Sequence, residues 1–87
     1  MGNKDLHKAI LAAIDDEPRQ IGLLNQVDAA FGNKLYGQGL IALTRSGYIE
    51  NMGSIETAPD GRVMPSVQHN TRLSQRGKEY LAKLSGR

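Results

Sequence analysis

The chain has 87 residues, no cysteine and a formal net charge of +2. This length predicts a single domain over residues 1–87, with so small a core that dimerisation would add stability. Without cysteine there is no disulfide framework and no zinc or redox site built on thiolates. No apolar run approaches the roughly 18–20 residues of a transmembrane helix, and the N-terminus lacks the apolar run of a signal peptide. We therefore expect a cytoplasmic protein with no membrane partner.

The charges are spread unevenly along the chain. Residues 1–32 contain three Lys or Arg and five Asp or Glu, whereas residues 33–87 contain eight and four. A basic half is typical of proteins that bind a polyanion. The same charges would equally suit an ordinary solvated surface, so the charge pattern leaves both interpretations open.

Two helices are predicted in the N-terminal third. Residues 4–15 and residues 20–30 both repeat apolar side chains at the spacing of a helix with one buried face. The positions expected to face the core are Leu6, Ile10, Leu11, Ile14, Ile21, Leu24 and Val27. Pro18 pushes the residue before it out of the helical region and so ends the first helix. Gly32 and Asn33 both tolerate a positive φ and indicate the turn after the second helix.

A third helix is predicted over residues 33–46. Tyr36, Leu40 and Leu43 stand at i, i+4 and i+7, the spacing of a side that faces a core. Gly47 then ends the helix, as a capping residue with left-handed backbone does.

Two glycines inside this helix, Gly37 and Gly39, cost about 1 kcal/mol each relative to alanine. Either they allow the backbone to approach DNA or a neighbouring helix closely, or the helix begins later, near Gln38. The sequence does not decide between these interpretations.

Residues 48–73 change to an extended pattern and are predicted to form a two-stranded β-hairpin. The run Ala58-Pro59-Asp60-Gly61 is the strongest turn signal in the chain, because Pro presets φ, Asp bonds the local backbone and Gly accepts a positive φ. Pro65 restricts the second strand to an edge or an irregular stretch. Ser74 is expected to cap the last helix. The apolar face of that helix is expected to consist of Tyr80, Leu81 and Leu84.

Two stretches resemble a known class of proteins. Leu40-x-x-Leu43-x-x-x-Gly47-Tyr48-Ile49 is similar to the end of the recognition helix in winged helix-turn-helix regulators. Leu73-Ser74-x-x-Gly77-x-x-x-Leu81 is similar to the segment that follows the wing in the PadR-like and MarR-like families. The resemblance implies an α+β winged helix-turn-helix with three helices, a two-stranded hairpin as wing and a C-terminal helix. It also implies a homodimeric transcription regulator that binds double-stranded DNA.

In a helix-turn-helix, the second helix of the motif enters the major groove and presents its N-terminal residues to the bases. With Tyr36 and Leu40 inward, the opposite side of the third helix faces the groove. The helix residues expected to contact DNA are Asn33, Lys34, Gly37, Gln38, Ile41 and Arg45. Gln38 is suited to adenine, and Lys34 and Arg45 to guanine or phosphate.

Two arginines outside the helix are further candidates for DNA contact. Arg62 at the hairpin tip is placed to reach a minor groove or a phosphate. Arg72, just before the last helix, either contacts the DNA backbone or lies in solvent. The alternative for the whole chain is a winged helix that serves as a protein-interaction module without nucleic acid.

No residue pattern indicates an enzyme, a cofactor or a metal site. His7 and His69 lie far apart in the chain, and neither belongs to a His-Glu-x-x-His motif or a cluster of carboxylates. Thr44 and Ser46 have no His or carboxylate at a spacing that would indicate a catalytic base for a hydroxyl nucleophile. No glycine-rich phosphate loop follows a strand.

Overall fold

The computed structural model describes residues 3–16, 19–68 and 70–86, so Pro18 and His69 lie outside the described residues. Its elements follow in the order α1 (Asn3–Asp15), α2 (Gln20–Phe31), α3 (Asn33–Arg45), β1 (Ile49–Glu50), β2 (Ile55–Thr57), β3 (Val63–Pro65), β4 (Arg72–Leu73) and α4 (Gln75–Leu84). The fold is therefore α+β, as expected, and this order is compatible with a winged helix-turn-helix. None of the described helices has the length and apolarity needed to cross a membrane.

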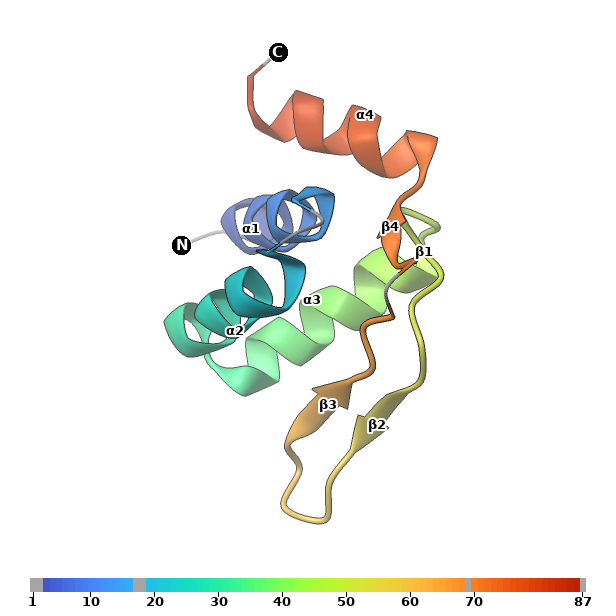
Figure 1. Cartoon of the computed structure of the whole chain (residues 1–87). Coiled ribbons are helices and arrows are strands. Elements are labelled where there is room, and N and C mark those ends of the chain that lie inside the picture. The colour runs from blue at the N-terminus through green and yellow to red at the C-terminus, as the bar shows by residue number, and fades with distance from the viewer. Residues whose placement is uncertain (1–2, 17–18, 69, 87) are drawn as a thin grey trace.

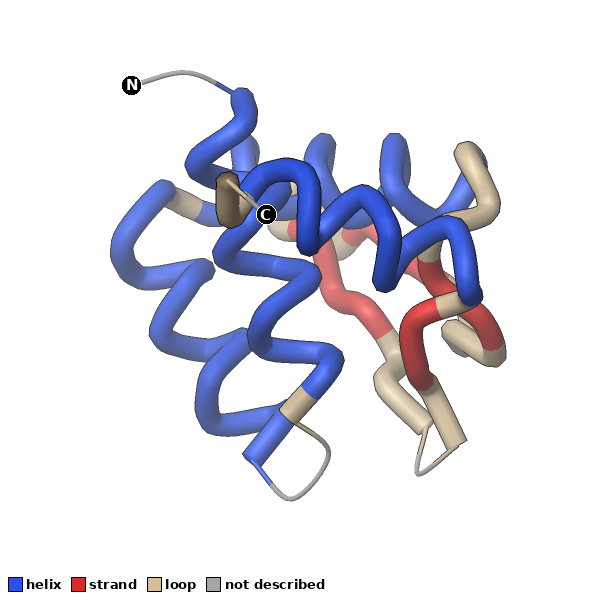
Figure 2. Tube along the Cα trace, turned by 90° about the horizontal axis from the view of Figure 1, so that it is seen from above, coloured by secondary structure: helices blue, strands red, loops and turns tan. Residues whose placement is uncertain are grey.

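The core lies where α1 meets the other three helices and the base of the strands. Its fully buried side chains include Ile10, Leu11 and Ile14 of α1 together with Leu40 and Leu43 of α3. The strands gather on one side of α1 and α2, and the segment that contains β2 and β3 projects beyond the helices (Figures 1 and 2).

One expected core position, Ile21, is wrong, because its side chain is 65% exposed. The buried positions of α2 are Gln20, Leu24 and Val27. These positions are spaced i, i+4 and i+7, whereas the expected positions were spaced i, i+3 and i+6, so only the first differs, by one residue. A glutamine takes the inward place because its amide finds two partners there.

The Gln20 side chain joins three parts of the chain. Its Nε2 donates to the carbonyl oxygens of Ile14, at the end of α1, and of Thr71, before β4, both at 2.7 Å. The Thr71 hydroxyl in turn donates to the carbonyl of Asn51 at 2.8 Å. Gln20 and Thr71 are both buried, so these bonds satisfy polar groups that water does not reach.

The predicted hairpin is present as two short antiparallel ladders. β1 pairs with β4 through Ile49↔Leu73 and Glu50↔Arg72, and β2 pairs with β3 through Ile55↔Pro65, Glu56↔Met64 and Thr57↔Val63. Between the ladders the strands are irregular, and Asn51 has a positive φ of 61°. We call residues 49–73 the hairpin.

The predicted turn at the hairpin tip is confirmed. The Gly61 amide donates to the Ala58 carbonyl at 2.8 Å, and Gly61 has a φ of +89°. The Asp60 carboxylate accepts a bond from the Arg62 amide at 3.0 Å, as a turn-forming aspartate does.

The capping role predicted for Gly47 is also confirmed. Gly47 has a φ of +81°, its amide donates to the Thr44 carbonyl, and the Tyr48 amide donates to the Leu43 carbonyl, both at 3.1 Å. These two bonds form the Schellman motif that satisfies the last carbonyls of a helix.

The two motifs singled out in the sequence meet in space at this turn. The Ser74 hydroxyl caps α4 by accepting a bond from the Gly77 amide at 3.1 Å, and it donates to the Gly47 carbonyl at 2.6 Å. The Ser74 amide donates to the Tyr48 carbonyl at 3.0 Å. Gly77 lies so close that a Cβ there would overlap the Tyr48 carbonyl oxygen. The first turn of α4 thus rests directly on the turn that ends α3.

We predict that Gly77→Ala lowers the free energy of unfolding by about 1–3 kcal/mol, because a backbone carbonyl has to move to admit the methyl group. Chemical denaturation measures this change. The matched control is Gly22→Ala, since Gly22 of α2 has open space around it. Alanine is the better helix former, so the control is expected to raise stability by about 0.5–1 kcal/mol. Equal changes in the two variants would contradict the contact.

Candidate nucleic-acid interface

The outer side of α3 is the first part of the candidate site. Lys34, Gln38 and Arg45 are exposed and Ile41 is half-buried, as expected from the inward position of Tyr36. The helix contains no Asp or Glu between Asn33 and Arg45. Its exposed side therefore combines two cations, an amide and an apolar side chain without any opposing charge.

Asn33, by contrast, faces the hairpin. Its Nδ2 donates to the Val63 carbonyl at 3.1 Å, and its Oδ1 accepts a bond from the Val63 amide at 2.7 Å. The Asn33 amide thus bonds the edge of β3 as a neighbouring strand would. Because both of its polar ends are engaged in this way, Asn33 faces β3 and not the exposed side of α3, although the sequence analysis expected it to contact DNA.

Gly37 requires a similar correction. It is buried, and a Cβ at this position would overlap the Val63 side chain. A Cβ at Gly39 would come within 2.9 Å of Ile10 in α1. Since α3 begins at Asn33, the interpretation that the helix begins near Gln38 is wrong. The two glycines allow the hairpin and α1 to approach α3 closely.

Two residues that the sequence analysis did not select also lie on the exposed side of α3. Leu35 is 50% exposed, and Ala42 is exposed seven residues later. Only their positions in the sequence could have indicated this exposure, because Leu35 directly follows Lys34 and Ala42 directly follows Ile41. Apolar side chains of this kind are suited to the methyl group of thymine.

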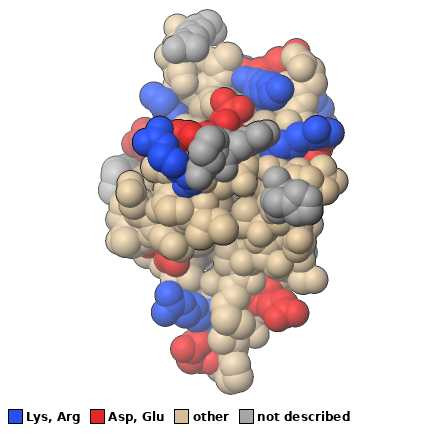
Figure 3. Space-filling view, in the orientation of Figure 1, with Lys and Arg blue, Asp and Glu red and all other residues tan. Residues whose placement is uncertain are grey.

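The hairpin tip forms the second part of the candidate site. Arg62 is exposed there, but Asp60 adjoins it in the turn, and Glu56 lies on β2 nearby. Basic and acidic side chains lie side by side at this end of the molecule (Figure 3). Met64 pairs with Glu56 across the strands and is 46% exposed. The tip is therefore mixed in charge, unlike α3.

Arg72 is held in an ion pair. Its Nε lies 3.1 Å from Oε2 of Glu50, its cross-strand neighbour in β1. Both side chains remain substantially exposed, so the bond is a surface ion pair of the kind that contributes at most about 1 kcal/mol. The Glu50 carboxylate compensates the charge that the sequence analysis assigned to DNA.

Arg76 reaches the turn that ends α3. Its guanidinium carbon lies 5.3 Å from the centre of the Tyr48 ring, and the Tyr48 ring stacks on that of Tyr80 at 4.7 Å. The Tyr80 hydroxyl lies 3.2 Å from Nδ1 of His7 in α1. This stack joins α1, the turn after α3 and α4. It brings a cation to the same end of α3 as Arg45.

Burial shifts the pKa of two groups near these elements. Burial, and after it the Asp28 carboxylate, raises the pKa of Tyr36 to about 12. Partial burial lowers the pKa of His7 below its ordinary value. Among the described residues, no three His, Asp or Glu side chains converge in a way that would hold a metal ion.

No protein-family model, curated protein or solved structure matches the chain. The interpretation of the site therefore depends on the arrangement of its own residues. The structure brings Lys34, Gln38, Ile41 and Arg45 onto one exposed side. It directs Asn33 and Gly37 towards the hairpin instead.

We predict that Asn33→Ala loosens the hairpin from α3. The variant loses two hydrogen bonds to Val63, each of which contributes about 0.5–1.5 kcal/mol. Hydrogen–deuterium exchange is expected to speed up at the Val63 amide more than at amides in the middle of α1. Asn25→Ala, on the exposed side of α2, is the matched control and is expected to leave both rates unchanged. An unchanged rate at Val63 in the Asn33 variant would contradict this role.

We also predict a loss of stability in alkali that depends on Tyr36. The folded state keeps this hydroxyl protonated up to a pKa of about 12, whereas an unfolded tyrosine titrates near pH 10. The folded state therefore binds more protons in this interval, and stability falls as the pH rises from about 10 to 12. Denaturation midpoints of the wild type and Tyr36→Phe measure it. The wild type is expected to show the steeper decline, and parallel declines would contradict the prediction.

Proposed function

We propose that the chain is a winged helix-turn-helix that binds double-stranded DNA in transcription regulation as a homodimer. The recognition helix is α3, and the hairpin is the wing. One observation carries the proposal: α3 turns a side with two cations and no acidic residue outward, beside a hairpin that projects past the helices (Figure 1). Major-groove readers present a helix in this way, and cations supply the affinity for phosphates.

The spacing along α3 supports a division of roles. Lys34 and Arg45 are eleven residues apart, or about 16 Å along a helix axis. The major groove is about 12 Å wide, so cations at this separation are suited to phosphates on its two sides. Gln38 lies between them, where its amide is placed to pair with adenine. Ile41 follows and offers an apolar contact.

The wing supports the same function through its attachment to α3. The two bonds between Asn33 and Val63 and the close contact at Gly37 fix β3 against the recognition helix. Arg62 at the tip is then held at a set distance from the groove, where a phosphate or a minor groove is its expected partner. The acidic neighbours of Arg62 make this contact weaker than those of α3.

The alternative is a winged helix that binds another protein. It is favoured by two exposed apolar side chains, Leu35 on α3 and Met64 on the wing, and by the acidic residues Glu56 and Asp60. Acidic side chains repel a phosphate backbone but suit a basic protein surface.

We predict that Lys34→Ala combined with Arg45→Ala lowers DNA affinity and reduces its dependence on salt. If each cation neutralises one phosphate, the slope of log K against log salt is expected to fall by about 2. Fluorescence anisotropy with genomic DNA fragments at several salt concentrations measures both quantities. Lys78→Ala combined with Lys83→Ala, which removes two exposed cations of α4, is the control and is expected to change the slope less.

Two results would contradict the proposal. If the α3 variant keeps the affinity and slope of the wild type, α3 is not at the interface. If the wild type binds no DNA even at low salt, the protein-interaction alternative replaces the proposal.

A further inference from the structure

The exposed side of α1 carries basic residues in its first half and acidic residues at its end. Lys4 and Lys8 are exposed near the N-terminus, and Asp15 is exposed in the last turn, which has no basic residue. The positive end of a helix dipole favours acids and the negative end favours cations, so Lys4 and Asp15 oppose the dipole of their own helix. Asp5 is the exception, since it suits the first turn.

These charges are not neutralised along α1 itself. Lys8 and Asp15 are separated by seven residues, or about 10 Å along the axis, which is too far for an ion pair. Within the described ranges, the ion pairs of the chain are Arg19 with Asp16 and Arg72 with Glu50. The opposing charges of α1 are thus available to a partner.

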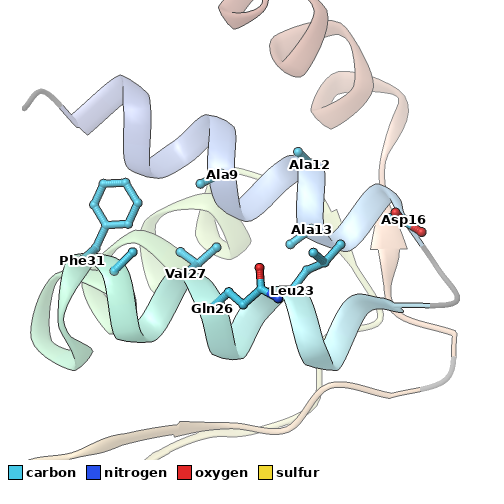
Figure 4. A pocket seen from close by; sticks show the side chains of 9 residues that line it. Ala9, Ala12, Ala13, Asp16, Leu23, Gln26, Val27 and Phe31 are labelled. Atoms are coloured by element: carbon cyan, nitrogen blue, oxygen red, sulfur yellow. The ribbon is translucent and has the colours of Figure 1, made fainter.

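Between these charges, the exposed side of α1 forms a shallow ridge at Ala12, with a groove on each side. The groove against α2 has a volume of about 420 Å³ and an apolar lining that includes Ala9, Leu23 and Phe31 (Figure 4). The groove against α4 has a volume of about 490 Å³ and is lined by Leu81 together with the charged residues Lys8, Asp15 and Lys78. Ala12 lines both grooves and is itself exposed. With only a methyl group on this ridge, another helix is able to come close.

We propose that α1 pairs antiparallel with α1 of a second copy of the chain, around a two-fold axis near Ala12. This arrangement places Lys8 of each copy opposite Asp15 of the other. Every charge contact occurs twice, because a two-fold contact uses the same surface on both copies. The acidic end of each helix receives the lysines of its neighbour, which relieves the opposition to the dipole. Side chains of the second copy then enter the two grooves.

Other occupants satisfy this surface less well. A parallel arrangement would set lysines against lysines and aspartates against aspartates. The phosphate backbone of a nucleic acid would suit Lys4 and Lys8 but would be repelled by Asp15. A helix of a single sign would likewise match only one half of α1. The surface is complementary to itself.

The homodimer belongs to the function proposed above, and this inference names its surface. It is tested without DNA, so its failure would leave DNA binding by α3 to be judged separately.

Charge reversal tests the antiparallel pairing. Sedimentation equilibrium is measured at low salt for the wild type, Lys8→Asp, Asp15→Lys and the double variant. The wild type is expected to be a dimer. Each single reversal puts like charges together at two sites, so the dissociation constant is expected to rise on the order of ten-fold. The double variant restores opposite charges and is expected to recover most of the loss. Lys83→Asp on α4 is the control and is expected to keep the wild-type value.

A second variant tests the close approach of the helices. Ala12→Glu places a longer, charged side chain on the surface between the two grooves and is expected to give a monomer. Circular dichroism is expected to show that the helices of this variant are retained. A monomeric wild type would overturn the proposal. So would a dimer that Ala12→Glu and both single reversals leave intact, or a double variant that remains dissociated.

Discussion

The position of the hairpin and of α4 depends on the joint between the turn that ends α3 and the first turn of α4. The carbonyls of Gly47 and Tyr48, which follow α3, accept hydrogen bonds from the hydroxyl and the amide of Ser74, respectively. Gly77 lets α4 lie directly on this backbone. Because β1 starts just after Tyr48 and β4 ends just before Ser74, the same contacts bring the two ends of the hairpin together.

A second constraint fixes which side of α3 remains open. Tyr36 and Leu40 bury one side of α3 in the core. Asn33 and Gly37 pack a neighbouring side against β3. Only the side with Lys34 and its neighbours is left for solvent or a partner. The exposure of that side follows from packing and hydrogen bonding elsewhere on the helix.

Local patterns in the sequence were sufficient for the elements but not for all of the candidate site. Helical spacing located α1 to α3, and the turn chemistry around Asp60 located the hairpin tip. The missed features depend on residues distant in the chain. Ile21 was placed inside because its apolar character gave no sign that Gln20 would bond with Thr71. Asn33 and Arg72 were predicted to contact DNA, and their partners Val63 and Glu50 could not be foreseen because these residues are distant in the chain. Lys34, Gln38 and Arg45 needed only helical geometry, and they are exposed as expected.

The bonds between Asn33 and Val63 have a consequence for the solubility of the protein. An open strand edge is a template on which another chain can add a strand, and such edges promote aggregation. In β3 that edge is already occupied, since a side-chain amide takes up the donor and acceptor of Val63. Pro65 on the same strand has no amide hydrogen to offer. The hairpin thus extends into solvent with one of its two edges closed to amyloid-like growth.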